Sequence, residues 1–228
     1  MSLKLLVTDV PMNIRKQVLA IAAKYAGVEL EMPHFMPAMV ETSQAFALNC
    51  HPMQKNPVLR TEDGYIFETN AILRYIARLG DKNNAGLYGR TAFEAAQVDQ
   101  WLDFTLTELS EAVWTCLLHT VLSERVPAYK KTPEELKKAV ATVNDAFCAL
   151  NLTLEVRTFL VGERLTAADL AVATYLDAAL RFCGDADLFT KYPHVSRYHA
   201  TIYGQATFQE GLSLVLGAPY TAPVAPGK

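Results

Sequence analysis

The first eighty residues alternate between short apolar runs and a helical period. Leu3–Thr8 is apolar almost throughout and predicts a buried strand. Asn13–Ala26 places apolar side chains on one face and stops before Gly27, which predicts a helix. Val28–Met32 predicts a second strand. A strand, a helix and a strand within about thirty residues form a βαβ unit, so the two strands should be parallel.

A hairpin and a second helix follow. Asn56–Arg60 is a short apolar run, Asp63-Gly64 is a turn signal, and Tyr65–Phe67 is an aromatic and β-branched strand. The proline that opens the first of these runs predicts a cis Asn56–Pro57 bond in a tight turn. Helical spacing then relates Ile72, Tyr75, Ile76 and Leu79. This βαβ and ββα order is that of a thioredoxin-like domain.

The rest of the chain reads as helical. Residues 93–109 form an amphipathic pattern, and Thr132–Glu135 is a capping box with proline at the first helical position, ahead of a stripe over 136–154. Thr166 and Asp169 form a second capping pair before a helix that is apolar nearly all round. Asp169 is therefore interpreted as a buried cap rather than a catalytic acid, since its carboxylate can satisfy N–H groups at the helix start.

These patterns predict an α+β N-terminal thioredoxin-like domain followed by an all-α domain. The expected boundaries are 1–80 for the first domain, 81–90 for a polar Gly/Asn-rich linker, and 91–217 for the helical domain. Residues 218–228 are expected to be a flexible tail or the start of an interdomain linker.

Residues 33–50 have no clean period and are rich in Met, Phe and Pro. They predict a loop with at most one irregular helix. The apolar side chains of Phe35, Met36, Met39 and Val40 either form a surface for a partner or pack under the domain.

Composition narrows the function classes. The 228-residue chain carries a net charge of −3 and no long basic run, which argues against a nucleic-acid partner. The apolar segments are too short or too interrupted to cross a membrane, and the N-terminus does not resemble a signal peptide. The four cysteines lack a Cys-x-x-Cys motif, as expected of reduced thiols in the cytoplasm. The five histidines show no metal-ligand spacing, so no metal is expected.

The junction at Glu68 and Thr69 is the first candidate site. Unpaired N–H groups and the positive end of a helix dipole meet there and can hold a carboxylate, although a plain helix N-cap has the same residues. Together with Pro57, this pattern resembles the glutathione-binding half of glutathione transferases, and Thr166 with Asp169 matches the buried capping box of their second domain. The resemblance covers residues 3–215.

The resemblance implies a role for each matching residue. The peptide of Asn56 ahead of Pro57 would pair with the cysteinyl part of glutathione, Glu68 and Thr69 would hold its γ-glutamyl end, and Lys55 would lie near its glycyl end. Asn56 departs from the family, which usually has Val or Ile there. Glutathione or a related thiol is thus a candidate ligand or cosubstrate, and no other cofactor is implied.

A transferase lowers the thiol pKa with a donor at the start of the first helix. Many family members place Tyr, Ser or Cys there, but residues 8–13 offer only Thr8 and Asn13. Asn13 is the candidate catalytic donor, and a helix N-cap is its alternative role. Asp9 would oppose a thiolate. Arg15 and His51 are lesser candidates for binding a glutathione carboxylate.

One branch of the family matches best. Residues 10–27, 95–104 and 157–172 resemble the gamma subunits of eukaryotic elongation factor 1. This implies a cytoplasmic role in protein biosynthesis, as a scaffold for the nucleotide-exchange subunits of that complex, in a homodimer or hetero-oligomer. The alternative is an active glutathione S-transferase, expected to be weak because the hydroxyl is missing. A third hypothesis, a redox sensor, has only the loop position of Cys50 behind it.

Overall fold

The computed structural model describes residues 3–9, 12–34, 43–81, 85–124, 126–184 and 187–217. These residues divide into two compact units. The first holds the described residues up to 90 together with 205–217, and the second holds those between 91 and 204. The expected apolar side chains of Phe35, Met36, Met39 and Val40, and the expected tail at 218–228, lie outside the described residues.

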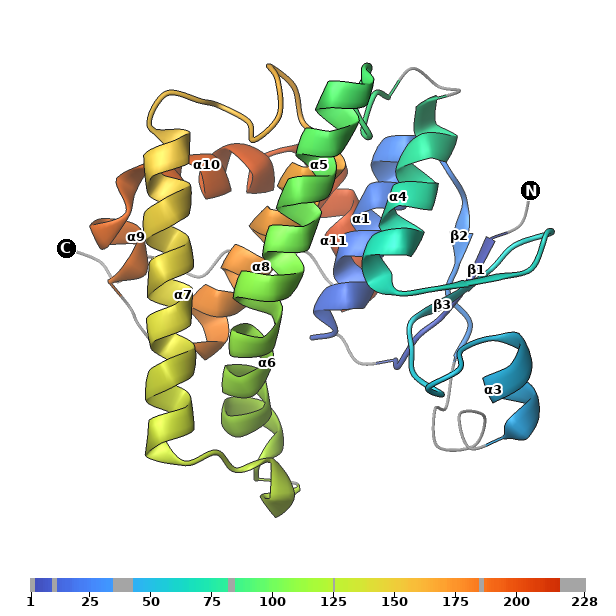
Figure 1. Ribbon diagram of the computed structural model, residues 1–228, viewed down its shortest axis with the longest axis horizontal. Coiled ribbons are helices and arrows are strands. Elements are labelled where there is room, and N and C mark those ends of the chain that lie inside the picture. The colour runs from blue at the N-terminus through green and yellow to red at the C-terminus, as the bar shows by residue number, and fades with distance from the viewer. Residues whose placement is uncertain are drawn as a thin grey trace. The chain divides into compact units, whose positions relative to one another are not determined.

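The first unit is built on a four-stranded sheet (Figure 1). Its strands are β1 (Leu3–Leu6), β2 (Leu30–Glu31), β3 (Val58–Arg60) and β4 (Tyr65–Phe67), in the order β2-β1-β3-β4. β1 and β2 are parallel and β3 and β4 are antiparallel, as the sequence predicts, and β1 also pairs antiparallel with β3. β2 is shorter than expected because it pairs with β1 only at Leu30 and Glu31, and β1 is shorter than expected because its pairing with β3 stops at Leu6.

Helices α1 (Ile14–Ala26) and α4 (Thr69–Gly80) pack against each other in the first unit (Figure 1). Gly80 allows their close approach, since a Cβ at this position would lie 2.9 Å from the Ala26 Cα. Gly27 ends α1 with φ 64°, a left-handed conformation that glycine adopts without strain. Among the described residues of the segment 33–50, where the sequence predicts a loop with at most one irregular helix, α3 (Gln44–Asn49) is a short α-helix.

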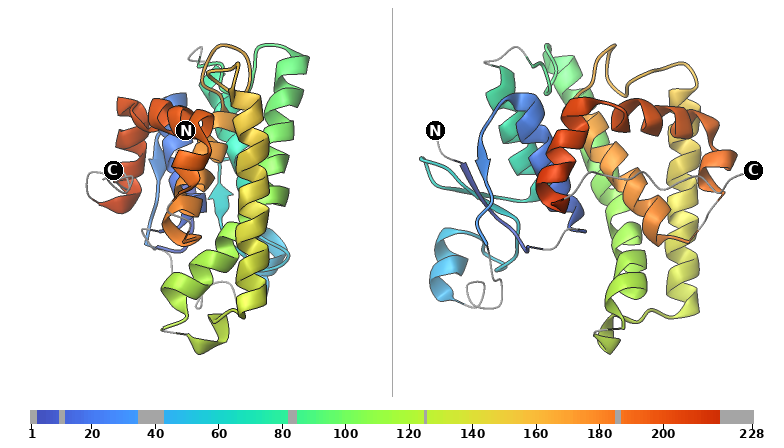
Figure 2. Two further views of the ribbon diagram at one scale, coloured as in Figure 1. Left: turned by 90° about the vertical axis from the view of Figure 1, so that its left-hand side faces the viewer. Right: turned by 180° about the vertical axis from the view of Figure 1, so that it is seen from behind.

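Two segments that the sequence analysis placed outside the first domain belong to the first unit. Helix α11 (Ala206–Leu216) packs on α1, where a Cβ on Gly211 would lie 2.6 Å from the Ile21 Cα (Figure 2, right). Within the expected linker, Leu87 and Tyr88 are buried, and the Arg78 guanidinium lies 4.5 Å from the Tyr88 ring centroid. The hydrophobic period identifies an apolar stripe but not the surface that covers it, so these assignments required the structure.

The second unit is helical (Figure 2). Along the chain it contains α5 (Ala92–Phe104), the π-helical η2 (Thr105–Ser110), α6 (Glu111–Leu117), the π-helical η3 (Leu118–Leu122), the 3-10 turn η4 (Pro127–Tyr129), α7 (Pro133–Leu154), α8 (Ala167–Phe182), α9 (Leu188–Lys191) and α10 (Pro193–Tyr203). α8 is buried along nearly its whole length, and α5, α6 and α10 pack on it.

The single helix expected over 93–109 is interrupted. Its α-helical part ends at Phe104, and a π-helical segment follows. The hydroxyls of Thr105 and Thr107 donate to the carbonyl oxygens of Trp101 and Asp103, four residues earlier. Such hydroxyl bonds give these carbonyl oxygens a side-chain donor in addition to the backbone ladder.

Asp169 closes the capping box of α8 from inside the second unit. Its carboxylate accepts hydrogen bonds from the Leu160 N–H at 2.9 Å, the Thr166 N–H at 2.8 Å and the Tyr198 hydroxyl at 3.0 Å. Burial raises the pKa of Asp169 to about 6, and these donors oppose the rise. Since the folded protein then holds this proton more tightly than the unfolded chain, the contribution of this carboxyl to stability falls as pH rises from about 4 to about 6.

Replacing Asp169 with Ala should lower the free energy of unfolding by about 3 kcal/mol, because several buried donors lose their acceptor at once. Asp169→Asn keeps one acceptor oxygen, so its free energy of unfolding should lie between those of the parent and Asp169→Ala. Urea unfolding measures the stability of both variants. The matched control is Asp145→Ala, at an exposed acidic position on α7, whose free energy of unfolding should stay within about 0.5 kcal/mol of the parent's. An Asp169→Ala protein as stable as that control would show that the cap does not hold α8.

Candidate functional site

Three chain segments meet at one end of the sheet. Leu6 of β1 pairs with Val58 of β3, and Val58 pairs with Phe67 of β4. The end of β1, the turn that enters β3 and the exit from β4 into α4 therefore lie together. This geometry brings the sequence-predicted residues Asn56 and Pro57 to the same end of the sheet as Glu68 and Thr69.

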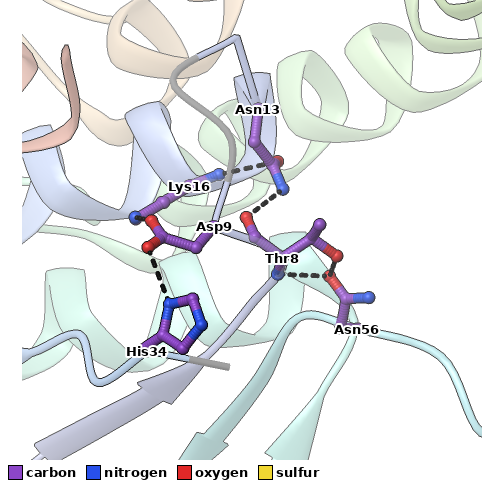
Figure 3. Close-up of polar contacts among 6 residues, drawn as sticks. All are labelled: Thr8, Asp9, Asn13, Lys16, His34 and Asn56. Atoms are coloured by element: carbon purple, nitrogen blue, oxygen red, sulfur yellow. Dashed lines mark hydrogen bonds and ion pairs between the residues drawn. The ribbon is translucent and has the colours of Figure 1, made fainter. Parts of the chain in front are cut away.

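Asn13 joins the end of β1 to the start of α1 (Figure 3). Its Oδ1 accepts a hydrogen bond from the Lys16 N–H at 3.2 Å and caps the helix, while its Nδ2 donates to the Thr8 carbonyl oxygen at 3.2 Å. The Thr8 contact uses one of the two Nδ2 hydrogens. Asn13 is thus an N-cap that keeps a second N–H for an acceptor beside the positive end of the α1 dipole.

The Asn56 side chain ties the proline turn to β1. Its Oδ1 accepts from both the N–H and the hydroxyl of Thr8, each at 3.2 Å (Figure 3). The Asn56–Pro57 bond is cis, as predicted from the sequence. The Arg15 guanidinium donates to the Asn56 carbonyl oxygen at 3.3 Å. The sequence analysis gave Asn56 only a backbone role. A polar residue at a position where the family usually has Val or Ile could have indicated this side-chain role.

The charges beside this junction are paired. Lys16 Nζ lies 2.6 Å from Asp9 Oδ1, and His34 Nδ1 lies 3.3 Å from Asp9 Oδ2 (Figure 3). The Lys16 ammonium, and then His34, hold the pKa of Asp9 below its ordinary value, so this carboxylate stays ionised. The sequence predicts Asp9 as an opposing charge but misses Lys16, which is nearly buried and neutralises it.

Glu68 stands at the N-cap of α4 without capping it. Its φ is 70°, a backbone conformation that residues other than glycine rarely adopt, and its side chain makes no cap hydrogen bond. The carboxylate is exposed, with Oε1 3.9 Å from Nε2 of the buried His51. His51 Nδ1 accepts from the Met53 N–H at 3.1 Å, which leaves the ring proton on Nε2, facing Glu68.

The remaining residues that the sequence predicted for this site are Lys55 and Thr69. Lys55 is exposed just ahead of Asn56, and Thr69 is half-buried as the first residue of α4. Within the described ranges, no three His, Cys, Asp or Glu side chains gather to hold a metal ion. In that same part of the chain, no helix is both long and apolar enough to cross a membrane.

Two family models match the chain. The glutathione S-transferase N-terminal domain covers residues 2–78, and the glutathione S-transferase C-terminal domain covers residues 108–206. The chain belongs to the glutathione S-transferase family. Solved members share its fold: glutathione S-transferase-I bound with lactoylglutathione has a TM-score of 0.79 at 23% identity, covering 93% of this chain and 99% of that one. Glutathione transferase F2 from Populus trichocarpa has a TM-score of 0.82 at 17% identity, covering 95% and 100%.

The sequence relatives of the chain are elongation factor 1-gamma proteins. Elongation factor 1-gamma of Trypanosoma cruzi is 40% identical over 197 residues, which is 86% of this chain and 46% of that protein. Probable elongation factor 1-gamma 1 of Arabidopsis thaliana is 33% identical over 211 residues, covering 91% and 49%. The chain spans about half the length of the curated relatives it matches.

Asn13→Ala should destabilise the protein by about 1 kcal/mol through the lost cap of α1, whereas Asn13→Ser should retain most of the stability because its hydroxyl can accept the Lys16 N–H. Chemical denaturation of the two variants beside the parent measures this difference. Equal losses in the Ser and Ala proteins would mean that the cap is not the stabilising contact.

Proposed function

We propose that this chain is the transferase-like domain of an elongation factor 1 gamma subunit, acting in the cytoplasm as a scaffold for nucleotide-exchange subunits. The observation that carries the proposal is its 31–40% identity to elongation factor 1-gamma proteins over 83–91% of its length. The two solved transferases named above are 23% and 17% identical to it. Assembly with the exchange subunits, in a homodimer or hetero-oligomer, is part of this proposal.

The chemistry of the β1–α1 junction supports a scaffold over an efficient enzyme. Residues 8–13 contain no Tyr, Ser or Cys. The one hydroxyl in this segment belongs to Thr8, and its hydrogen is donated to Asn56 Oδ1. The neighbouring carboxylate of Asp9 is already matched by Lys16, so that ammonium does not add a net positive charge that would favour a thiolate.

An active transferase is the second candidate, and Glu68 is the observation that favours it. Its carboxylate is held in a strained backbone position without capping α4, at the sheet end where the cis-proline turn lies. A thiol tripeptide has an ammonium group that Glu68 can bind and a carboxylate that Lys55 can bind. Its peptide would run along Asn56 and its sulfur would face the second Asn13 N–H. Activity should be weak because an amide replaces the usual hydroxyl.

The scaffold proposal predicts stable association with a purified nucleotide-exchange subunit of elongation factor 1. Size-exclusion chromatography with light scattering should show one complex containing both proteins. Poplar glutathione transferase F2, which shares the fold at 17% identity, is the matched control and should elute alone. Separate elution of this chain, or equal binding by the control, would contradict the proposal.

The second candidate predicts that Glu68→Ala weakens glutathione binding roughly 10- to 100-fold, the range for removing a hydrogen-bond partner of a charged group. Titration calorimetry measures this, with Glu29→Ala, an exposed carboxylate ahead of β2, as the control for lost charge. Binding that is unchanged in the Glu68 variant would place the thiol elsewhere on the chain.

A further inference from the structure

The Arg15 side chain reaches from the first turn of α1 to the proline turn at the end of the sheet. Arg15 is the second residue of α1, and its Nη1 donates a hydrogen bond to the Asn56 carbonyl oxygen at 3.3 Å. Arg15 is exposed and Asn56 is half-buried. The contact thus joins two segments that lie 41 residues apart in the sequence, on the solvent-exposed side of the first unit.

The stability of α1 does not explain a cation at this position. The positive end of the helix dipole lies at the first turn, where a positively charged side chain is unfavourable, and the first turn of α1 holds no acidic residue. The neighbouring Lys16 meets the same dipole, but its ammonium lies 2.6 Å from Asp9 Oδ1. The Nη1 of Arg15 is directed at a backbone acceptor of the proline turn, so its position matters for that acceptor rather than for the helix.

The Asn56 carbonyl is held in place by the rest of the turn. Asn56 Oδ1 accepts from the N–H and the hydroxyl of Thr8 at 3.2 Å each, and the next residue, Pro57, is buried. The turn therefore cannot swing this carbonyl away from Arg15 without breaking two hydrogen bonds to the end of β1. A guanidinium is a charged donor, which binds an acceptor more strongly than a neutral peptide N–H does.

We propose that Arg15 makes an autoinhibitory contact, in which its guanidinium competes with a bound thiol peptide for the Asn56 carbonyl. The peptide needs this carbonyl as the acceptor for its own backbone N–H. The inference rests on the second candidate function, in which the peptide runs along Asn56. Because the Arg15 contact is exposed, solvent and salt weaken it, and a peptide can displace it at a modest loss of affinity.

The sequence analysis gave Arg15 the opposite role, as a lesser candidate for binding a glutathione carboxylate. The two roles predict opposite signs for the same substitution. Loss of a carboxylate-binding cation weakens the binding of an anionic tripeptide, whereas loss of a competing donor strengthens it. Loss of positive charge alone also weakens the binding of an anion, so tighter binding would have no simple electrostatic explanation.

Titration calorimetry of S-methylglutathione at pH 7 against the full chain and its Arg15→Ala variant tests the proposal. This probe keeps the tripeptide but has no thiol, so an effect of Arg15 on thiol ionisation cannot contribute. The dissociation constant should be roughly 3- to 10-fold smaller for Arg15→Ala, the range for an exposed hydrogen bond from a charged donor. Lys24→Ala, which removes an exposed cation from the last turn of α1, is the matched control and should bind no more tightly than the parent.

The outcomes separate this inference from the function on which it rests. Binding by the parent that is unchanged or weaker in Arg15→Ala, or equal tightening in Lys24→Ala, would overturn the autoinhibitory contact alone. No binding by either the parent or Arg15→Ala would overturn it together with the second candidate function. If Arg15→Ala binds more tightly and adding Glu68→Ala has no effect, the contact is supported while the assigned role of Glu68 fails. Melting curves check that each variant is folded.

Discussion

The arrangement of the candidate site depends on how the polar groups at one end of the sheet are satisfied. β1 ends there, α1 begins there, and the cis-proline turn enters β3 beside them. Two asparagines connect these segments: Asn13 caps α1 and bonds the Thr8 carbonyl, and Asn56 accepts from the Thr8 N–H and hydroxyl. Buried or half-buried polar groups that lacked such partners would each cost about 1–3 kcal/mol.

The same contacts limit what the site can do. A hydroxyl can help to ionise a bound thiol only if its hydrogen is free to be donated, but the Thr8 hydroxyl donates to Asn56 Oδ1 and holds the proline turn. The Asn56 carbonyl, which would pair with a peptide, is bonded by the exposed Arg15 side chain. By contrast, Glu68 is positioned by a strained backbone and remains exposed. The cis-proline turn and the Glu68 carboxylate thus lie at the same end of the sheet, while the Thr8 hydroxyl and the Asn56 carbonyl are committed to structural hydrogen bonds.

Local patterns predicted much of this architecture. Period and turn residues indicated the parallel β1–β2 pair, the hairpin and the burial of nearly all of α8, because each depends on residues that are close in sequence. The π-helical turns, the packing of α11 on α1 and the burial of Tyr88 depend on which groups meet in space. The Asn56–Thr8 bonds and the Lys16–Asp9 pair belong to this second class.

We propose that the site can hold a thiol peptide but does not ionise it. The most direct measurement is the ultraviolet absorbance of the thiolate during a pH titration of the protein saturated with glutathione, against glutathione alone. We expect no thiolate signal at pH 7 and a thiol pKa within about one unit of its ordinary value near 8.5. A bound thiol that is largely ionised at pH 7 would contradict it and would establish a working catalytic site at the start of α1.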